Sequence, residues 1–203
     1  MYIDHRLREL TIRRSIFHSE ADFQHSLAWI LHNCFPNAGV RLEYPVRLLR
    51  KNEHDTRHLD IWVKERKIAI ELKYKTDSFS GQSEGEKYLL KHHKPHNGRY
   101  MFIKDIKRLE DLLDTGAITK GYAILLTNNE RLWHKSRKSE RVSAEFSLEH
   151  GTFLKRKMKW KSGRRDSISL RYKHEINWKP YSTSNGSIFK YLVVRVKQKK
   201  NRS

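Results

Sequence analysis

The sequence contains few of the residues that mark secreted or membrane-spanning chains. Only one of its 203 residues is a cysteine, Cys34, and a single cysteine cannot form an internal disulfide. The first residues lack the apolar segment of a secretory signal, and the longest apolar runs are too short to cross a bilayer. These absences exclude a disulfide scaffold and a transmembrane helix, and they predict a cytoplasmic protein without a membrane partner.

Proline and glycine are scarce as well, with four and nine residues, whereas 11% of the chain is aromatic. Hydrophobic residues make up 37% and charged residues 33%. This composition predicts a folded chain with a compact core and an ionic surface rather than a disordered one. The length suits one domain of about 100 to 200 residues with an additional segment.

Acidic residues are too few to balance the basic ones. Forty-three Lys and Arg against 23 Asp and Glu give a formal net charge of +20, which predicts a polyanionic partner. Residues 131–203 hold 21 of the basic residues and only 5 acidic ones. We therefore divide the chain into a better-patterned core at 1–130 and a basic, mostly β extension at 131–203 that we expect to bind nucleic acid.

Hydrophobic periodicity predicts helix, three strands, helix and strand within the first 130 residues. Ser19 precedes apolar residues at helical spacing, with Asp22 as the expected capping-box partner. Pro45 interrupts an alternating strand and favours a sheet edge or a bulge. The expected elements are a helix at 19–34, a strand at 40–48, a hairpin at 58–74, a long loop at 77–98 with a helical turn at 87–91, a helix from about Phe102 that ends at Gly116, a strand at 122–126, and further strands at 142–148, 168–172 and 191–196.

The hairpin carries the most informative pattern. A two-residue turn at Glu65 and Arg66 places Asp60 directly opposite Glu71, with Lys73 two residues further along the same face. The predicted core face consists of Ile61, Val63, Ile68, Ile70 and Leu72, and the other face of Asp60, Trp62, Ala69, Glu71 and Lys73.

Two carboxylates about 4.5 to 5.5 Å apart at Cβ repel each other, but they suit a hard divalent cation that prefers oxygen ligands. A nearby Lys73 could orient a water molecule or stabilise charge on a phosphate. The alternative is a solvated strand face on which acid and base alternate, because such short patterns are common. The combination of spacing, register and element order favours phosphodiester hydrolysis.

Asp60, ten intervening residues and then Glu71-Leu72-Lys73 resemble the motif of the PD-(D/E)xK nuclease superfamily. The resemblance covers about residues 15–130, and Leu59 stands where the family name has a proline. The segments 71–76 and 105–110 also resemble a group of uncharacterised prokaryotic members. It implies a restriction-endonuclease-like α/β core, αβββαβ, with a mixed central sheet flanked by helices.

The resemblance also implies roles for individual residues. Asp60 and Glu71 would hold one or two Mg²⁺ ions, which Mn²⁺ could replace, with the main-chain oxygen of Leu72 as a further ligand. Lys73 would orient the attacking water. Glu20 matches the acid that many members carry on the first helix as an additional metal contact, although an acid in a first helical turn is also stabilised by the helix dipole.

We therefore expect a Mg²⁺-dependent DNA endonuclease of the restriction or defence type that acts on duplex DNA. The alternatives are a structure-specific nuclease for junctions or mismatches, and a non-catalytic DNA-binding protein with the same fold. A homodimer is one of the oligomeric states left open. The residues expected to contact nucleic acid are Lys155, Arg156, Lys157, Lys159, Lys161, Arg164 and Arg165, with Lys104 beside the site.

Overall fold

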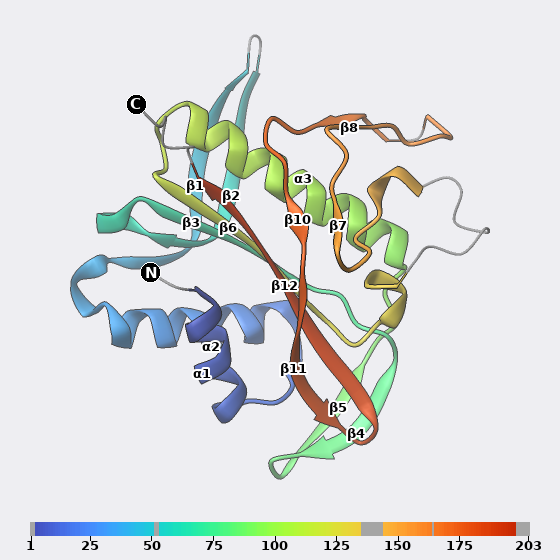
Figure 1. Cartoon of the computed structure of the whole chain (residues 1–203). Coiled ribbons are helices and arrows are strands. Elements are labelled where there is room, and N and C mark those ends of the chain that lie inside the picture. Colours follow the sequence, from blue (N-terminus) through green and yellow to red (C-terminus); the bar gives the residue numbers. More distant parts are fainter. Residues whose placement is uncertain (1–2, 51–52, 135–143, 164, 198–203) are drawn as a thin grey trace.

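The computed structural model is a mixed α/β protein in which helices cover both faces of a central sheet (Figure 1). It describes residues 3–50, 53–134, 144–163 and 165–197. The helices are α1 (Ile3–Arg13), α2 (Glu20–Cys34) and α3 (Pro95–Asp114), with short 3₁₀ turns η1 (Pro36–Ala38), η2 (Lys64–Arg66) and η3 (Glu130–Leu132). The strands are β1 (Val40–Arg50), β2 (Glu53–Val63), β3 (Ile68–Tyr74), β4 (Phe79–Ser83), β5 (Glu86–Leu90), β6 (Lys120–Thr127), β7 (Thr152–Phe153), β8 (Lys157–Met158), β9 (Ile168–Ser169), β10 (Glu175–Ile176), β11 (Trp178–Ser184) and β12 (Ser187–Lys197).

Helix α2 begins where the sequence predicts. The hydroxyl of Ser19 accepts a hydrogen bond from the N–H of Asp22 at 3.1 Å, which satisfies one of the free donors of the first turn. The reciprocal half of the capping box is shifted by one residue, because the Asp22 carboxylate accepts from the N–H of His18 at 2.9 Å instead of from Ser19. A second helix, α1, precedes it and was not expected.

The described part of the central sheet has the strand order β1-β2-β3-β6-β12-β11. Only β3 and β6 run parallel, because helix α3 returns the chain between them; the other neighbours are antiparallel. Strand β1 lies at an edge, as Pro45 predicts, since proline cannot donate a backbone hydrogen bond to a further strand.

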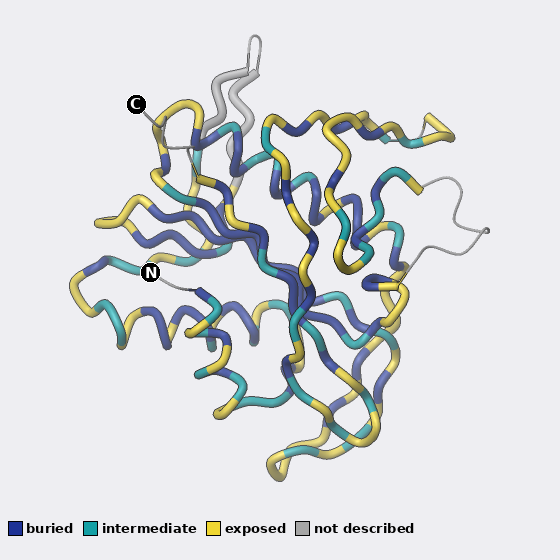
Figure 2. Tube along the Cα trace, in the orientation of Figure 1, coloured by how far each residue is buried: buried dark blue, intermediate teal, exposed yellow. Residues whose placement is uncertain are grey.

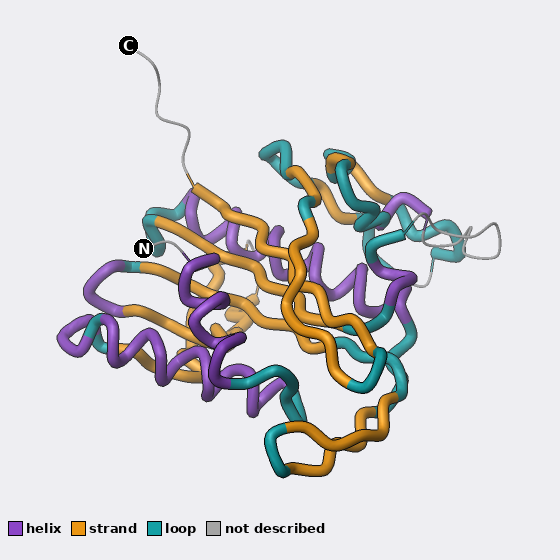
Figure 3. The backbone as a smooth tube through the Cα atoms, turned by 60° about the horizontal axis from the view of Figure 1, so that its bottom comes forward, coloured by secondary structure: helices purple, strands orange, loops and turns teal. Residues whose placement is uncertain are grey.

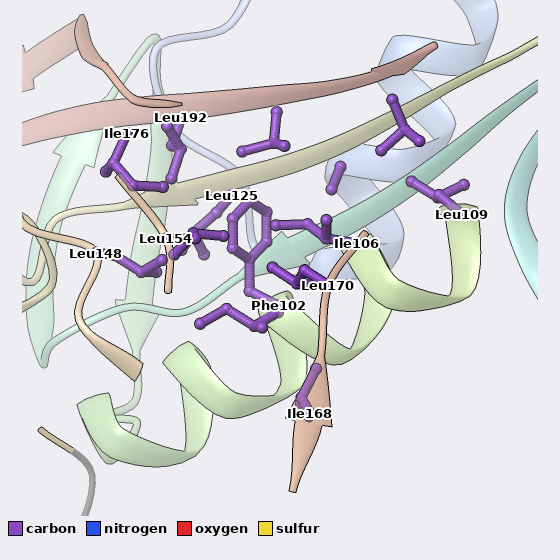
Figure 4. Close-up of a cluster of buried hydrophobic side chains, with 14 of the residues drawn as sticks. Phe102, Ile106, Leu109, Leu125, Leu148, Leu154, Ile168, Leu170, Ile176 and Leu192 are labelled. Atoms are coloured by element: carbon purple, nitrogen blue, oxygen red, sulfur yellow. The ribbon is translucent and has the colours of Figure 1, made fainter. Parts of the chain in front are cut away.

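Both faces of the sheet are buried (Figure 2), and helices lie on both sides of the strands (Figure 3). The expected core face, with Ile61 and Ile70, packs on α1 and α2. The opposite face is buried as well, since Trp62 and Ala69 pack there beneath α3. The core on this face combines residues of α3 and β6 with residues of the C-terminal third (Figure 4). The former include Phe102, Ile106, Leu109 and Leu125, and the latter Leu148, Leu154, Ile168, Leu170, Ile176 and Leu192. A parallel pair such as β3 and β6 is typically covered on both sides in this way.

The prediction of a long loop at 77–98 is wrong. Strands β4 and β5 form an antiparallel hairpin, and α3 already begins at Pro95, whose missing N–H is tolerated in a first helical turn. The predicted helical turn at 87–91 is instead strand β5, in which Tyr88 and Leu90 are buried while Glu86, Lys87 and Leu89 are exposed. The sequence gives no clear alternation here, because the exposed residue between Tyr88 and Leu90 is the apolar Leu89.

The C-terminal third contributes to the same sheet as the first 130 residues. Strand β12 pairs along its length with β6, from Lys190 opposite Thr127 to Lys197 opposite Lys120, and β11 pairs with β12. The strand expected at 191–196 is therefore confirmed, and that at 168–172 is shorter, since β9 has two residues. No strand is assigned to 144–148, and Val142 lies outside the described residues.

None of the helices in the described ranges is both long and apolar enough to cross a membrane.

Candidate active site

The β2–β3 hairpin has the predicted register but a longer connection. Val63 pairs with Ile68 and Ile61 with Ile70, as the predicted register requires, but the pairing ends there and does not extend to Asp60 and Glu71. The predicted two-residue turn is wrong, because four residues connect the strands through η2 and Lys67, whose φ of 46° is left-handed. Both connections have the same centre, and the register is therefore unchanged.

Asp60 lies where strands β2 and β3 diverge. The ladder between them ends at Ile61, and the Oδ2 of Asp60 then accepts a hydrogen bond from the N–H of Leu72 at 2.5 Å. The side chain thus replaces the backbone acceptor that β2 no longer supplies. Burial raises the pKa of Asp60 above its usual range, although Lys73 and the Leu72 N–H favour the charged form.

Glu71 is buried, with 1% of its surface exposed. Its Oε2 accepts a hydrogen bond from Nη2 of Arg108 on α3, whereas Oε1 is buried and has no hydrogen-bond partner among the described residues. Burial raises the pKa of Glu71 well above its usual range and outweighs the stabilising effect of Arg108. The carboxylate is therefore short of positive charge.

Lys73 points into a ring of oxygen atoms. Its Nζ lies 3.0 Å from Oδ2 of Asp105, 3.8 Å from Oε1 of Glu20 and 3.9 Å from Oδ2 of Asp60. It also donates to the main-chain oxygen of Leu72 at 2.7 Å. Burial alone would lower the pKa of Lys73, but these carboxylates outweigh it and raise the pKa, so the ammonium group stays charged.

Glu20 reaches the site from the first residue of α2. Its Oε2 accepts from the N–H of Tyr74 at 2.8 Å and from Nζ of Lys75 at 2.7 Å, while Oε1 faces Lys73. The helix start is thereby fixed against the end of β3. Of the two acids in that first turn, only Glu20 is directed toward Lys73, since Asp22 pairs with Arg14.

Helix α3 supplies two site residues that the sequence did not identify. Asp105 is 5% exposed and contacts Lys73, and Arg108 contacts both Glu71 and Asp105. The side chain of Arg108 is directed inward, onto the carboxylates of Glu71 and Asp105. The available signal was polar residues three apart beside the apolar positions Phe102, Ile106 and Leu109.

Gln24 and Glu43 complete the polar surroundings. The amide Nε2 of Gln24 donates to the main-chain oxygen of Asp60 at 2.6 Å and to Oε1 of Glu43 at 2.7 Å. Glu43 has a left-handed φ of 47°, an unusual conformation for a strand residue. Through Gln24, helix α2 holds the backbone of β2 at the point where it leaves β3.

Within the described residues, no three His, Cys, Asp or Glu side chains converge as a ready set of metal ligands. The carboxylates instead contact Arg108, Lys73, Lys75 and the Leu72 N–H. The donor chemistry nevertheless fits a hard cation, because every candidate ligand atom is an oxygen and Oε1 of Glu71 is buried without a partner. The expected ligands Asp60, Glu71, Glu20 and the Leu72 oxygen all belong to this one cluster.

The residues expected to contact nucleic acid differ in how far they are exposed. The side chains of Lys155, Arg156, Lys157, Lys159 and Lys161 are exposed on and around β8. Arg165 is instead partly buried, with its guanidinium carbon 4.6 Å from the ring centre of Tyr100 and 5.3 Å from that of Trp160, and it donates to Asn97. Lys104 is partly exposed on α3, one residue before Asp105. Arg164 lies outside the described residues.

Comparisons with known proteins give no family model, no curated protein and no solved structure that matches the chain.

Proposed function

We propose that the chain is a metal-dependent nuclease that hydrolyses phosphodiester bonds in DNA, with a restriction-endonuclease-like core. The observation that carries this proposal is the cluster at the β2–β3 fork: Lys73 is held as a cation among Glu20, Asp60 and Asp105, and Glu71 beside it has an unpartnered buried oxygen. Acidic oxygens next to a fixed ammonium group are the groups that phosphodiester hydrolysis requires.

Asp60 and Glu71 would hold Mg²⁺ or Mn²⁺, with the main-chain oxygen of Leu72 and the carboxylate of Glu20 as further ligands. When bound, the ion would lower the pKa of a water molecule and neutralise charge on the phosphate. Because Lys73 stays protonated, it serves as a hydrogen-bond donor to water or to a phosphate oxygen rather than as a general base.

The basic surface supports DNA as the substrate. Five exposed cationic side chains lie around β8, and none of them has an ion pair with another described residue. Such residues can neutralise phosphates without first losing an internal partner. A cytoplasmic restriction or defence enzyme, or a nuclease specific for junctions or mismatches, would use the same site.

One observation favours the non-catalytic alternative, in which the fold only binds DNA. The carboxylates of the site are already neutralised in part by Lys73, Lys75 and Arg108. A protein that never binds a metal would also need such internal partners, because buried carboxylates without counter-charges are costly.

Cleavage assays distinguish the two functions. We expect the parent protein to cut supercoiled plasmid in the presence of Mg²⁺ and to lose this activity in EDTA, while Asp60→Asn and Glu71→Gln abolish cleavage and keep DNA affinity in EDTA. Glu65→Gln is the matched control, since Glu65 lies exposed in the same hairpin. We expect this variant to cleave DNA as the parent does. Parallel assays on linear duplex, branched DNA and RNA identify the substrate. DNA binding without divalent-dependent cleavage of any substrate would establish the non-catalytic function.

A further inference from the structure

Helix α3 bridges the two charged residues of the E-x-K segment on β3. Nη2 of Arg108 donates to Oε2 of Glu71 and to Oδ1 of Asp105 at 3.1 Å, and Oδ2 of Asp105 lies 3.0 Å from Nζ of Lys73. Glu71, Arg108, Asp105 and Lys73 therefore form a continuous chain of alternating charges. Two of its members are expected to take part in cation binding and catalysis.

Arg108 occupies one of the two oxygens with which Glu71 could bind a cation. The side chain of Glu71 is 0% exposed and that of Arg108 is 17% exposed, so the pair is shielded from water. In such surroundings, Arg108 at Oε2 and a divalent ion at the free Oε1 of the same carboxylate would repel each other strongly. A divalent ion and Arg108 therefore compete for Glu71.

The guanidinium is also incompletely satisfied in its present position. Nε of Arg108 is buried and has no hydrogen-bond partner among the described residues. Its contact with Asp105 is different in kind, because the two residues lie three apart on the same helix and can stay together when the Glu71 contact is lost. Arg108 can therefore leave Glu71 without becoming an isolated buried charge.

We propose that Arg108 is an internal counter-ion of Glu71 that a divalent cation must displace, with Asp105 retaining the released guanidinium. This inference rests on the proposed metal-dependent function. The counter-ion keeps the buried carboxylate stable in the metal-free protein and weakens cation binding, because part of the binding free energy is used to break the ion pair. Arg108 is thus a positioning residue that sets the cation concentration at which the site fills.

The test measures cation binding to the full chain without DNA, so it does not depend on catalysis. Isothermal titration calorimetry with Mn²⁺ should show about tenfold tighter binding in Arg108→Gln than in the parent, since the competing cation is removed. Thermal melting should show a lower Tm for the metal-free variant and a larger rise in Tm on adding Mn²⁺ than the parent gives.

Lys107→Gln is the matched control, because it removes the same charge from the neighbouring position of α3, where Lys107 pairs with Asp111 on the helix surface. We expect its Mn²⁺ affinity to remain close to that of the parent. If Arg108→Gln does not fold, Arg108→Lys takes its place: it keeps the charge with fewer donors and should bind Mn²⁺ more tightly than the parent by a smaller factor.

The outcomes separate this inference from the proposed function. Equal Mn²⁺ affinities in the parent and in the Arg108 variants, or an equal increase in Lys107→Gln, would overturn the counter-ion role and leave a metal-dependent site intact. If Mn²⁺ binds to none of the proteins, the metal-dependent function itself fails, and the counter-ion role fails with it. Tighter binding confined to the Arg108 variants supports both.

Discussion

At the scale of single residues, the state of Lys73 depends on its carboxylate neighbours more than on its burial. Burial alone would lower the pKa of Lys73, but Asp105, Asp60 and Glu20 reverse this effect, and Asp105 lies nearest at 3.0 Å. Asp105 therefore sets both the position and the charge of the ammonium group. In the proposed nuclease it acts through Lys73 and does not itself contact the substrate.

Asp105→Asn should lower the single-turnover rate of DNA cleavage while DNA affinity changes little. Removal of this carboxylate lowers the pKa of Lys73, so the alkaline limb of the pH–rate profile should move to lower pH. Rates between about pH 7 and 10, compared with those of the parent, measure the shift. A uniformly lower rate with an unchanged profile would indicate a purely structural role for Asp105.

Lys73→Gln is expected to reduce the rate of cleavage far more than the affinity for DNA. One buried lysine contributes little to a basic surface with many exposed cations. Single-turnover kinetics and binding measurements at the same salt concentration separate the two effects. A large loss of affinity at an unchanged rate would make Lys73 a DNA contact instead.

At the scale of elements, Glu110 attaches the C-terminal segment to α3. The carboxylate is buried and accepts from the N–H groups of Arg171 at 2.8 Å and Tyr172 at 3.0 Å, and it lies 2.9 Å from Nε2 of His174. Burial would raise the pKa of Glu110, but these hydrogen bonds outweigh it and lower the pKa. The charged form is therefore the one that stabilises this junction.

Glu110→Ala should reduce the free energy of unfolding by about 3 kcal/mol, because it leaves buried donors without an acceptor. Asp114 also lies on α3 but forms a more exposed ion pair, with Arg171. Asp114→Asn should therefore reduce the free energy of unfolding by less than about 1 kcal/mol. Urea unfolding at neutral pH measures both values. Similar losses in the two variants would contradict the role assigned to Glu110.

The same residue predicts a pH dependence of stability. Its folded-state pKa is lower than the unfolded value of about 4.3, so its contribution is fully present above that value and is lost as the pH falls through the folded-state pKa. Urea midpoints in the acidic range should therefore fall more steeply for the parent than for Glu110→Gln. Parallel curves would show that Glu110 does not contribute in this way.

The elements that the sequence predicted correctly are those fixed by local chemistry. Ser19 marks the start of α2, and the apolar alternation fixes the β2–β3 register even though the turn is longer than expected. Asp105 and Arg108 could not be assigned, because their direction depends on how α3 is rotated against β3. Periodicity shows which face of α3 is buried, but packing between segments distant in sequence decides which strand residues that face meets.

At the scale of the whole molecule, the proposed DNA surface and the proposed chemistry come from different parts of the chain. The exposed cations lie around β8, whereas the site lies between α2, β2, β3 and α3. Each neutralised phosphate contributes about −0.9 to the slope of log K against log salt.

Changing Lys155, Arg156, Lys157 and Lys159 together to Gln should weaken DNA binding and flatten the salt slope by up to about 3.6. Binding isotherms at several salt concentrations, with cleavage measured at saturating DNA, test this expectation. Because the site is intact, the saturated rate should stay near that of the parent. An unchanged slope would assign DNA binding to another surface.

Strand β12 makes the order of synthesis matter for this protein. Asp60, Glu71, Lys73 and Arg108 all leave the ribosome before β12, and about 60 residues separate the end of β6 from the start of its partner. At a synthesis rate of about 5 to 20 residues per second, one edge of β6 stays unpaired for about 3 to 12 seconds, and the apolar core is incomplete during that time. A nascent chain therefore carries every residue of the proposed site before β12 pairs with β6 and completes the central sheet.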